Sequence, residues 1–186
     1  ASGIIPQIAV IAGVCGGAMA TAASMFDIVI GADKGGSFYV NPPFVLNNLD
    51  KDANFGSVKT AAEGGLIQVV ADDDKAALAY ARRLLSYIPQ NSADGTAYST
   101  TSDEINRLTP DVGAIISAES YSMADVIKAI SDDAEFLELS ADYGKSMLTG
   151  LVSLNGMVIG VAANQPKVNG GKLTACAAKK AARFIS

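Results

Sequence analysis

The segment QIAVIAGVCGGAMATAASMF, residues 7–26, determines how the rest of the sequence is interpreted. Residues 7–12 form a short, continuous apolar run rich in Ile and Val, which is typical of a strand buried on both faces. Gly16 and Gly17 follow, and an alanine-rich stretch then continues to Phe26. The pattern therefore predicts a buried strand, a glycine turn and a buried helix.

Strands continue to alternate with helices after this segment. Three further short runs predict strands, at residues 27–31, 37–40 and 66–71. The sequence Asn41-Pro42-Pro43 predicts a turn into a short helix at 44–48, because the residue before a proline disfavours the helical conformation.

A longer helix is predicted over residues 73–88, where Pro89 ends it. The run 72–74 is Asp-Asp-Asp, and such side chains suit an N-cap and the first turn of a helix. A metal site at these carboxylates is the alternative, and helix capping is the preferred interpretation. Apolar residues recur at helical spacing and predict the buried face: Ala77, Ala81, Leu84, Leu85 and Ile88.

The composition changes over residues 90–101, which are mostly Asn, Ser, Thr, Gly and Asp. Such a stretch is typical of a surface linker, so we expect two packed units, 1–89 and 111–186, joined by a linker at 90–110. Within the second unit we expect a helix at 122–130, an extended segment at 136–139, a hairpin of 147–154 and 157–163 around Asn155-Gly156, and a C-terminal helix from Leu173. The alternation indicates an α/β protein.

Composition excludes several classes of function. The 186 residues contain 49% hydrophobic and 18% charged residues, as ordinary globular proteins do, and no histidine, which excludes every triad, general base or metal site that needs one. The net charge of −5 argues against a nucleic-acid surface. Cys15 and Cys176 form no disulfide framework, which favours a reducing, cytoplasmic compartment. Asp27 and several glycines interrupt the apolar stretch 8–30, so we interpret it as core and not as a membrane span.

The turn at residues 13–18 is the first candidate site. A strand there hands over to a helix, and the unpaired N–H groups of a helix start can hold an oxyanion, with glycine allowing the ligand to approach the backbone. Close packing of helix and strand is the alternative, and from the pattern alone it is the preferred interpretation of the glycines. The spacing of the glycines matches neither a P-loop nor the dinucleotide fingerprint.

Two further groups could carry chemistry, and each has a simpler interpretation. Cys15 could be a nucleophile at the start of a helix, but without a histidine to activate it we interpret it as a small buried hydrophobic residue. Tyr143 and Lys145 could form a tyrosine–lysine acid/base pair, but their spacing and the neighbouring strand argue against it.

Several short motifs, distributed along the whole chain, resemble those of one protein family. They are SGIIPQIAVI at 2–11 running into GVCGGA at 13–18, RLLSYIP at 83–89, NRL with Pro110 at 106–110, Tyr121 to Ile127, FLE at 136–138, Asp142 to Lys145, and the segment 150–168 with LNG and ANQPK. In this order they resemble the carboxyltransferase subunits of biotin-dependent acyl-CoA carboxylases and decarboxylases, of the propionyl-CoA carboxylase β and methylmalonyl-CoA decarboxylase α type.

The resemblance implies an α/β crotonase-like (ClpP/crotonase) ββα superhelical fold, in which residues 1–89 form the second half of an N-domain and 111–186 the first half of a C-domain. It implies transfer of a carboxyl group between biotin and an acyl-CoA, with no metal in this chain. The enolate would be held by an oxyanion hole at Gly16, Gly17 and Ala18, with the donors from either Gly16-Gly17 or Gly17-Ala18. The implied partners are further copies of the chain, a biotin carboxyl carrier protein, and a biotin carboxylase or a membrane decarboxylase subunit.

The sequence also departs from the family. Many relatives have Gly-Val-Ala-His where this chain has Gly65-Leu66-Ile67-Gln68, and the segment for a second oxyanion hole is not in the chain. A catalytically inactive accessory or truncated scaffold subunit is therefore the alternative function. A third hypothesis is a crotonase-fold hydratase or isomerase, which would need paired glutamates; Glu63 and Glu119 are the candidates.

Overall fold

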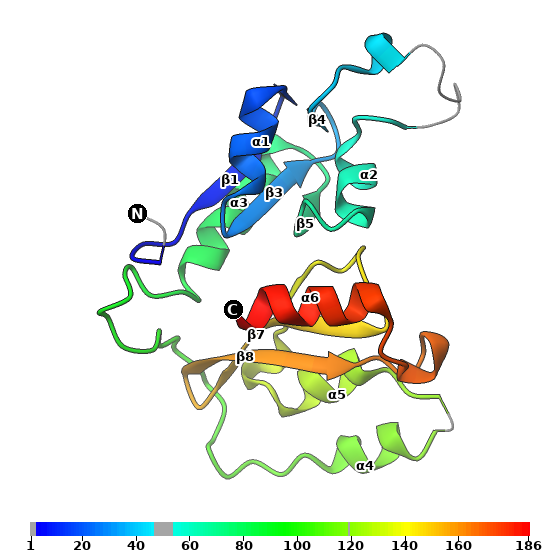
Figure 1. Ribbon diagram of the computed structural model, residues 1–186. Helices are drawn as coiled ribbons and strands as arrows, with labels where there is room; N and C mark the ends of the chain where they lie inside the picture. The colour runs from blue at the N-terminus through cyan, green and yellow to red at the C-terminus, as the bar shows by residue number, and fades with distance from the viewer. Residues whose placement is uncertain (1–2, 47–53, 119) are drawn as a thin grey trace. The chain divides into compact units, whose positions relative to one another are not determined.

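The computed structural model describes residues 3–46, 54–118 and 120–186 (Figure 1). The chain divides into two units, which we describe separately. Unit 1 consists of Ala1–Leu85 with Gln90–Ala93, and unit 2 consists of Ser86–Pro89 with Asp94–Ser186. The expected linker at 90–110 is therefore divided between the units: Gln90–Ala93 belong to unit 1 and the rest to unit 2.

Unit 1 is built on a parallel sheet. Its strand order is β1-β3-β5, formed by β1 (Ile8–Ile11), β3 (Ile28–Ala32) and β5 (Val69–Ala71). Two shorter strands, β2 (Val14–Gly16) and β4 (Ser37–Tyr39), form a separate parallel pair. The strands expected at 7–12, 27–31 and 37–40 are therefore confirmed, and of the strand expected at 66–71 only Val69–Ala71 is present. The strand β2 is an addition where we expected only a turn.

The α-helices in the described part of unit 1 are α1 (Ala18–Ser24), α2 (Val58–Glu63) and α3 (Asp74–Leu85). The sequence pattern did not predict α2, which Ser57 caps by accepting the Thr60 N–H at 3.1 Å. The short helix expected at 44–48 is a 3-10 turn, η1 (Pro43–Leu46), and positions 47 and 48 lie outside the described residues.

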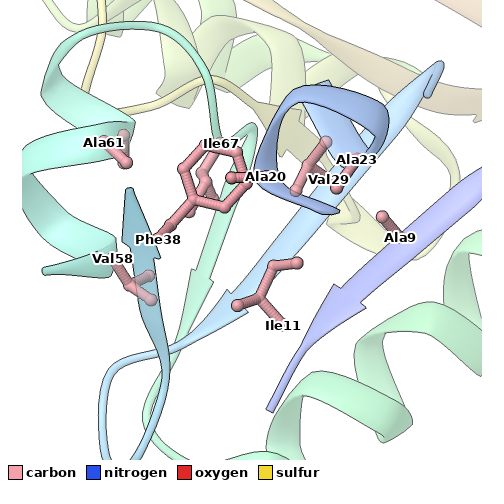
Figure 2. Packing of buried hydrophobic residues seen from close by; sticks show 10 residues of the cluster. Ala9, Ile11, Ala20, Ala23, Val29, Phe38, Val58, Ala61 and Ile67 are labelled. Carbon is pink, nitrogen blue, oxygen red and sulfur yellow. The ribbon is translucent and has the colours of Figure 1, made fainter. Parts of the chain in front are cut away.

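The core of unit 1 lies where α1 and α2 meet the strands. Figure 2 shows the Phe38 side chain among Ala20, Ala61 and Ile67, all members of one buried cluster. A Cβ on Gly31 of β3 would overlap the side chain of Val58, so this glycine lets α2 pack directly on the strand. Alanines on α1 serve the same purpose, because Ala20 and Ala23 are buried. The strand, glycine turn and helix predicted from residues 7–26 are present. The prediction that the helix is buried was wrong, because only Ala20 and Ala23 face the core and Met19 is 68% exposed.

Helix α3 begins where its capping residues predict, and its buried face differs from the predicted one at one leucine. The Asp73 carboxylate accepts the Ala76 N–H at 2.8 Å, which confirms helix capping. Ala77 and Leu84 are completely buried. The prediction for Leu85 was wrong: its side chain is 55% exposed, on the same face of the helix as Leu78, which is 58% exposed. The helix also ends at Leu85 and not at residue 88 as predicted.

These two adjacent leucines provide a matched test of the core. We expect Leu84→Ala to lower the free energy of unfolding by about 2–5 kcal/mol, because a cavity replaces a buried side chain. Leu85→Ala should cost less than about 1 kcal/mol. Urea melts of both variants measure the difference, and equal losses would contradict the observed burial.

Unit 2 is built on an antiparallel sheet with the order β6-β7-β8, formed by β6 (Leu137–Leu139), β7 (Met147–Leu154) and β8 (Met157–Asn164). The predicted hairpin is confirmed: Asn155 and Gly156 have φ values of 52° and 77°, the left-handed pair that a tight two-residue turn requires. The helices and short turns are α4 (Pro110–Ile116), α5 (Met123–Ile130), η2 (Asp132–Ala134), η3 (Asn169–Gly171) and α6 (Ala175–Ile185).

Both α5 and α6 pack on the central strand β7 (Figure 1). Leu148 and Val152 form a buried cluster with Ile127 of α5. The next strand meets α6, because a Cβ on Gly160 would lie 3.3 Å from the Phe184 ring. The expected linker contributes to this sheet: Val158 donates to the Ala97 carbonyl at 3.1 Å, and Ser99 donates to Gly156 at 2.7 Å.

A buried carboxylate joins the hairpin turn to the end of α5. Asp132 is 7% exposed and accepts hydrogen bonds from the Gly156 N–H and Ser153 hydroxyl, each at 2.8 Å, and from the Asn155 N–H at 3.0 Å. Burial acts to raise the pKa of Asp132, but these hydrogen bonds and the nearby Arg107 charge outweigh it and hold the pKa below its ordinary value. Arg107 also donates to the carbonyls of Ala129 and Ser131.

Candidate functional site

The residues of the expected oxyanion hole lie at the junction of β2 and α1. Gly16 ends β2, Gly17 is the N-cap of α1, and Ala18 is its first residue. Gly17 has φ 61° and ψ −133°, a conformation essentially restricted to glycine. The helix has seven residues, so the individual N–H groups matter here more than a helix dipole.

The hydrogen bonds at this junction distinguish the three residues. The Gly17 N–H donates to the Tyr39 carbonyl of β4 at 3.0 Å and is therefore occupied. Successive N–H groups of an extended strand point to opposite sides, so the Gly16 N–H is directed away from β4. The first bond inside α1 joins the Thr21 N–H to the Gly17 carbonyl, and no side chain among the described residues caps the Ala18 N–H. Gly16 and Ala18 therefore carry the N–H groups that could meet a ligand.

The two glycines are required for different reasons. A Cβ on Gly16 would lie 2.8 Å from the Tyr39 ring, which is the close-packing interpretation. A Cβ on Gly17 would meet no atom of the described residues within 4 Å, so within this part of the chain the backbone conformation alone requires glycine here. Tyr39 contacts this junction through both its ring and its carbonyl, and nothing in the sequence pattern singled it out.

An apolar pocket of about 330 Å³ lies beside the junction. It is lined by β1 and its continuation to Cys15, and by Met19, Ala22, Ala23 and Phe26 on the other side. Gly16, Gly17 and Ala18 do not line it, although Cys15 and Met19 flank them in the chain. Cys15 packs against the core of unit 1 and burial raises the pKa of its thiol, which supports its interpretation as a small hydrophobic residue.

The other sequence candidates do not assemble into sites. Lys145 lies 3.7 Å from Asp142, and a hydrogen bond with the Cys176 side chain raises the pKa of Tyr143, so each member of the expected tyrosine–lysine pair has another neighbour. Glu63 is exposed at the end of α2, and Glu119 lies outside the described residues.

The residue that stands in place of the family's histidine has a structural role. Gln68 is 7% exposed, and its side-chain oxygen accepts the buried Val29 N–H at 2.7 Å. Its own N–H donates to the Val29 carbonyl, so one glutamine satisfies both polar groups of a core residue in β3.

Within 3–46, 54–118 and 120–186, no three or more Cys, Asp or Glu side chains gather as metal ligands would. None of the helices in these ranges has the length and apolar character needed to cross a membrane.

Comparison with known proteins places these observations in a family. The carboxyl transferase domain family matches residues 1–186. The chain is 33% identical to the methylmalonyl-CoA carboxyltransferase 12S subunit of Propionibacterium freudenreichii subsp. shermanii and 30% identical to the mitochondrial propionyl-CoA carboxylase beta chain of Homo sapiens. Each comparison covers 100% of this chain and 36% of the length of the relative. The chain thus spans about a third of the length of these relatives.

Solved structures agree with the sequence comparison. One is a transcarboxylase 12S crystal structure with hydrolyzed methylmalonyl-coenzyme A bound, which matches with a TM-score of 0.91 and 33% identity. The match covers 99% of this chain and 38% of the transcarboxylase chain. Another is a single-chain, multi-domain long-chain acyl-CoA carboxylase, which matches with a TM-score of 0.79 and 27% identity. This match covers 97% of this chain and 18% of the carboxylase chain. The expected α/β crotonase-like fold is confirmed. Matched along its full length, the chain belongs to the carboxyl transferase domain family.

Proposed function

We propose that this chain is part of a biotin-dependent acyl-CoA carboxyltransferase, which moves a carboxyl group between biotin and the α-carbon of an acyl thioester. The observation that carries the proposal is the β2–α1 junction. Among the described residues no side chain caps the start of α1 there, and no atom lies within 4 Å of a Cβ placed on Gly17. The relatives of the chain are named as a methylmalonyl-CoA carboxyltransferase and a propionyl-CoA carboxylase. Biotin would supply the carboxyl group from a carrier polypeptide, and we assign no residue of this chain to holding it.

The chemistry requires a site for developing negative charge. When the α-carbon of the thioester is a carbanion, its charge is shared with the thioester oxygen, and N–H donors aimed at that oxygen stabilise it. In our proposal the Ala18 N–H is the principal donor, and the Gly16 N–H is the second. Gly17 contributes its glycine-only conformation, and the absence of a Cβ there lets the thioester approach.

An isotope assay tests this proposal directly. The carboxyltransferase that contains this chain is incubated with free biotin and malonyl-CoA or methylmalonyl-CoA labelled in the carboxyl group. We expect label to appear on biotin and unlabelled acyl-CoA to form in equal amounts. Hydration or isomerisation of an enoyl-CoA, with no transfer to biotin, would instead support the hydratase hypothesis.

A second candidate is a catalytically inactive accessory or scaffold subunit. It is favoured by one observation: the chain spans 36% of its curated relatives, so a polypeptide of this size would contain only part of a carboxyltransferase. Mass spectrometry of the native protein separates the two. A mass two to three times 19.0 kDa would support the enzyme, and a stable 19.0 kDa chain that transfers no carboxyl group would support the scaffold.

We also propose that the protein assembles as a homo-oligomer and works with a biotin carboxyl carrier protein, together with a biotin carboxylase or a membrane decarboxylase subunit. Large apolar side chains are exposed in this region. Val14 and Met19, which line the pocket, are 73% and 68% exposed, and Met25, which follows α1, is 80% exposed. Such a face favours association. The transcarboxylase 12S structure is described as a hexamer assembly. Sedimentation at micromolar concentration tests the proposal, and a stable monomer would contradict it.

Cytoplasmic location remains part of the proposal. Cys15 and Cys176 are free thiols, which a reducing compartment preserves.

A further inference from the structure

An unusual lysine lies on the inward face of α6. Ala177, Lys180 and Phe184 recur at helical spacing on this face, where apolar residues are expected. Ala177 is completely buried, and Lys180 is 3% exposed. Its neighbour Lys179 is exposed to solvent. A lysine this deeply buried is rare unless its charge is paired, so Lys180 calls for an explanation.

The amine of Lys180 has no hydrogen-bond acceptor among the residues that the structure describes. Charges do act on it, because Glu138 of β6 and Asp142 of the following loop attract the protonated amine. Burial opposes them and has the larger effect, so the pKa of Lys180 falls to about 8. A protonated amine in this position is therefore held without the hydrogen bonds that it would have in water.

The helix around Lys180 is closely fitted to unit 2 at both ends. Near its start, a Cβ on Gly144 would lie 2.9 Å from the Cys176 carbonyl oxygen. Near its end, Phe184 packs on Gly160. Lys180 lies one helical turn from each of these contacts. Its buried charge therefore acts at the middle of the surface by which α6 is docked.

We propose that Lys180 is a charge switch for the docking of α6: the helix is held more firmly on the sheet of unit 2 when this amine loses its proton. Protonation, which demands hydrogen bonds that the buried position does not provide, favours opening of the helix so that water can reach the amine. Docking should thus tighten as the pH rises from neutral to alkaline values.

The direction of this pH dependence follows from proton linkage. The ordinary value for lysine is 10.5, so between about pH 8 and 10.5 the undocked or unfolded state binds a proton that the docked state does not. Stability then increases with pH across this window and is constant below it. The ratio of folded to unfolded protein should rise about tenfold per pH unit at most, or about 10- to 100-fold between pH 8 and 10.

Other groups near α6 must be distinguished from Lys180. Burial raises the pKa of Glu138, while Lys180 and Lys128 of α5 lower it and Asp142 raises it. A raised carboxyl pKa makes stability fall with increasing pH, so Glu138 acts with the opposite sign to Lys180. Tyr143 beside Cys176 has a raised pKa, which makes stability fall with increasing pH and so opposes the effect of Lys180.

The experiment compares Lys180→Met with Lys179→Met, a matched control one residue away. Urea unfolding and hydrogen exchange of the α6 amides, corrected for the intrinsic rate, are measured from pH 7 to 10. We expect wild type and Lys179→Met to gain 10- to 100-fold in protection of α6 above pH 8, and Lys180→Met to lose that gain. Tyr143→Phe should retain it.

Two results would overturn the proposal. One is an unchanged pH dependence in Lys180→Met, and the other is a loss of protection with rising pH in wild type, as expected if the charged amine holds α6 through Glu138. If Lys180→Met does not fold, the ε-carbon shift of ¹³C-labelled Lys180 in the wild-type chain is titrated instead. A titration midpoint near 8 supports the switch, and one near 10.5 overturns it.

Discussion

Replacing Ala18 with proline is expected to lower kcat of the carboxyltransferase that contains this chain by about 10²- to 10³-fold, the loss typical of one oxyanion donor. Proline removes the backbone N–H and changes little else, because the first position of a helix has no intrahelical acceptor and suits the fixed φ of proline. Ala18 occupies this position in α1, and its side chain is exposed. The variant therefore tests the N–H group separately from the fold.

Ala18→Ser is the matched control, since it keeps the N–H and adds a small side chain at the same exposed position. We expect it to retain kcat within a few-fold and both variants to keep the wild-type melting temperature within a few degrees. Gly17→Val is a poorer test, because the φ of 61° would strain any other residue and confuse folding with catalysis. An Ala18→Pro enzyme with unchanged turnover and a normal melting temperature would remove Ala18 from the proposed site.

Local signals in the sequence predicted much of this fold. The Asn155-Gly156 pair predicted the hairpin because few other residues adopt two successive left-handed conformations, and Asp73 predicted the start of α3 because its carboxylate satisfies a free N–H group. The family resemblance extended these local elements to a crotonase-like fold. Such signals work because the relevant partners lie within a few residues of each other.

Features that depend on distant partners were not predictable. The Gly17 N–H is occupied by Tyr39, 22 positions away, and only the pairing of β2 with β4 brings the two together. Lys180 follows another lysine in the sequence and would be assigned to a solvated face, yet it is buried. The helix α2 is too short for a clear period, with six residues. For the proposed site, the sequence indicated the turn, and the structure adds that the Gly17 N–H already has a partner.

The second large effect concerns the stability of unit 2. Asp132→Ala is expected to lower the free energy of unfolding by about 3–5 kcal/mol, because it leaves buried donors at the hairpin turn without their charged acceptor. Both carboxylate oxygens accept hydrogen bonds, from the Asn155 N–H on one side and from Ser153 and Gly156 on the other. Asp132→Asn keeps the shape but turns an amide N–H₂ toward a donor, so we expect an intermediate loss of about 2 kcal/mol.

Asp133→Asn is the matched control for this prediction. Asp133 is the adjacent residue, exposed and at a φ of 52°, which asparagine also tolerates, so the expected loss is below about 0.5 kcal/mol. The pH provides a second test. Because the folded pKa of Asp132 lies below its ordinary value of 3.8, its contribution is complete above pH 4 and is lost as the pH falls through the folded pKa. Urea unfolding at pH 7 and pH 3 should therefore show a smaller gap between wild type and Asp132→Asn at the lower pH. Equal losses for the two asparagine variants, or a gap that widens in acid, would show that the carboxylate does not hold the hairpin turn to the end of α5.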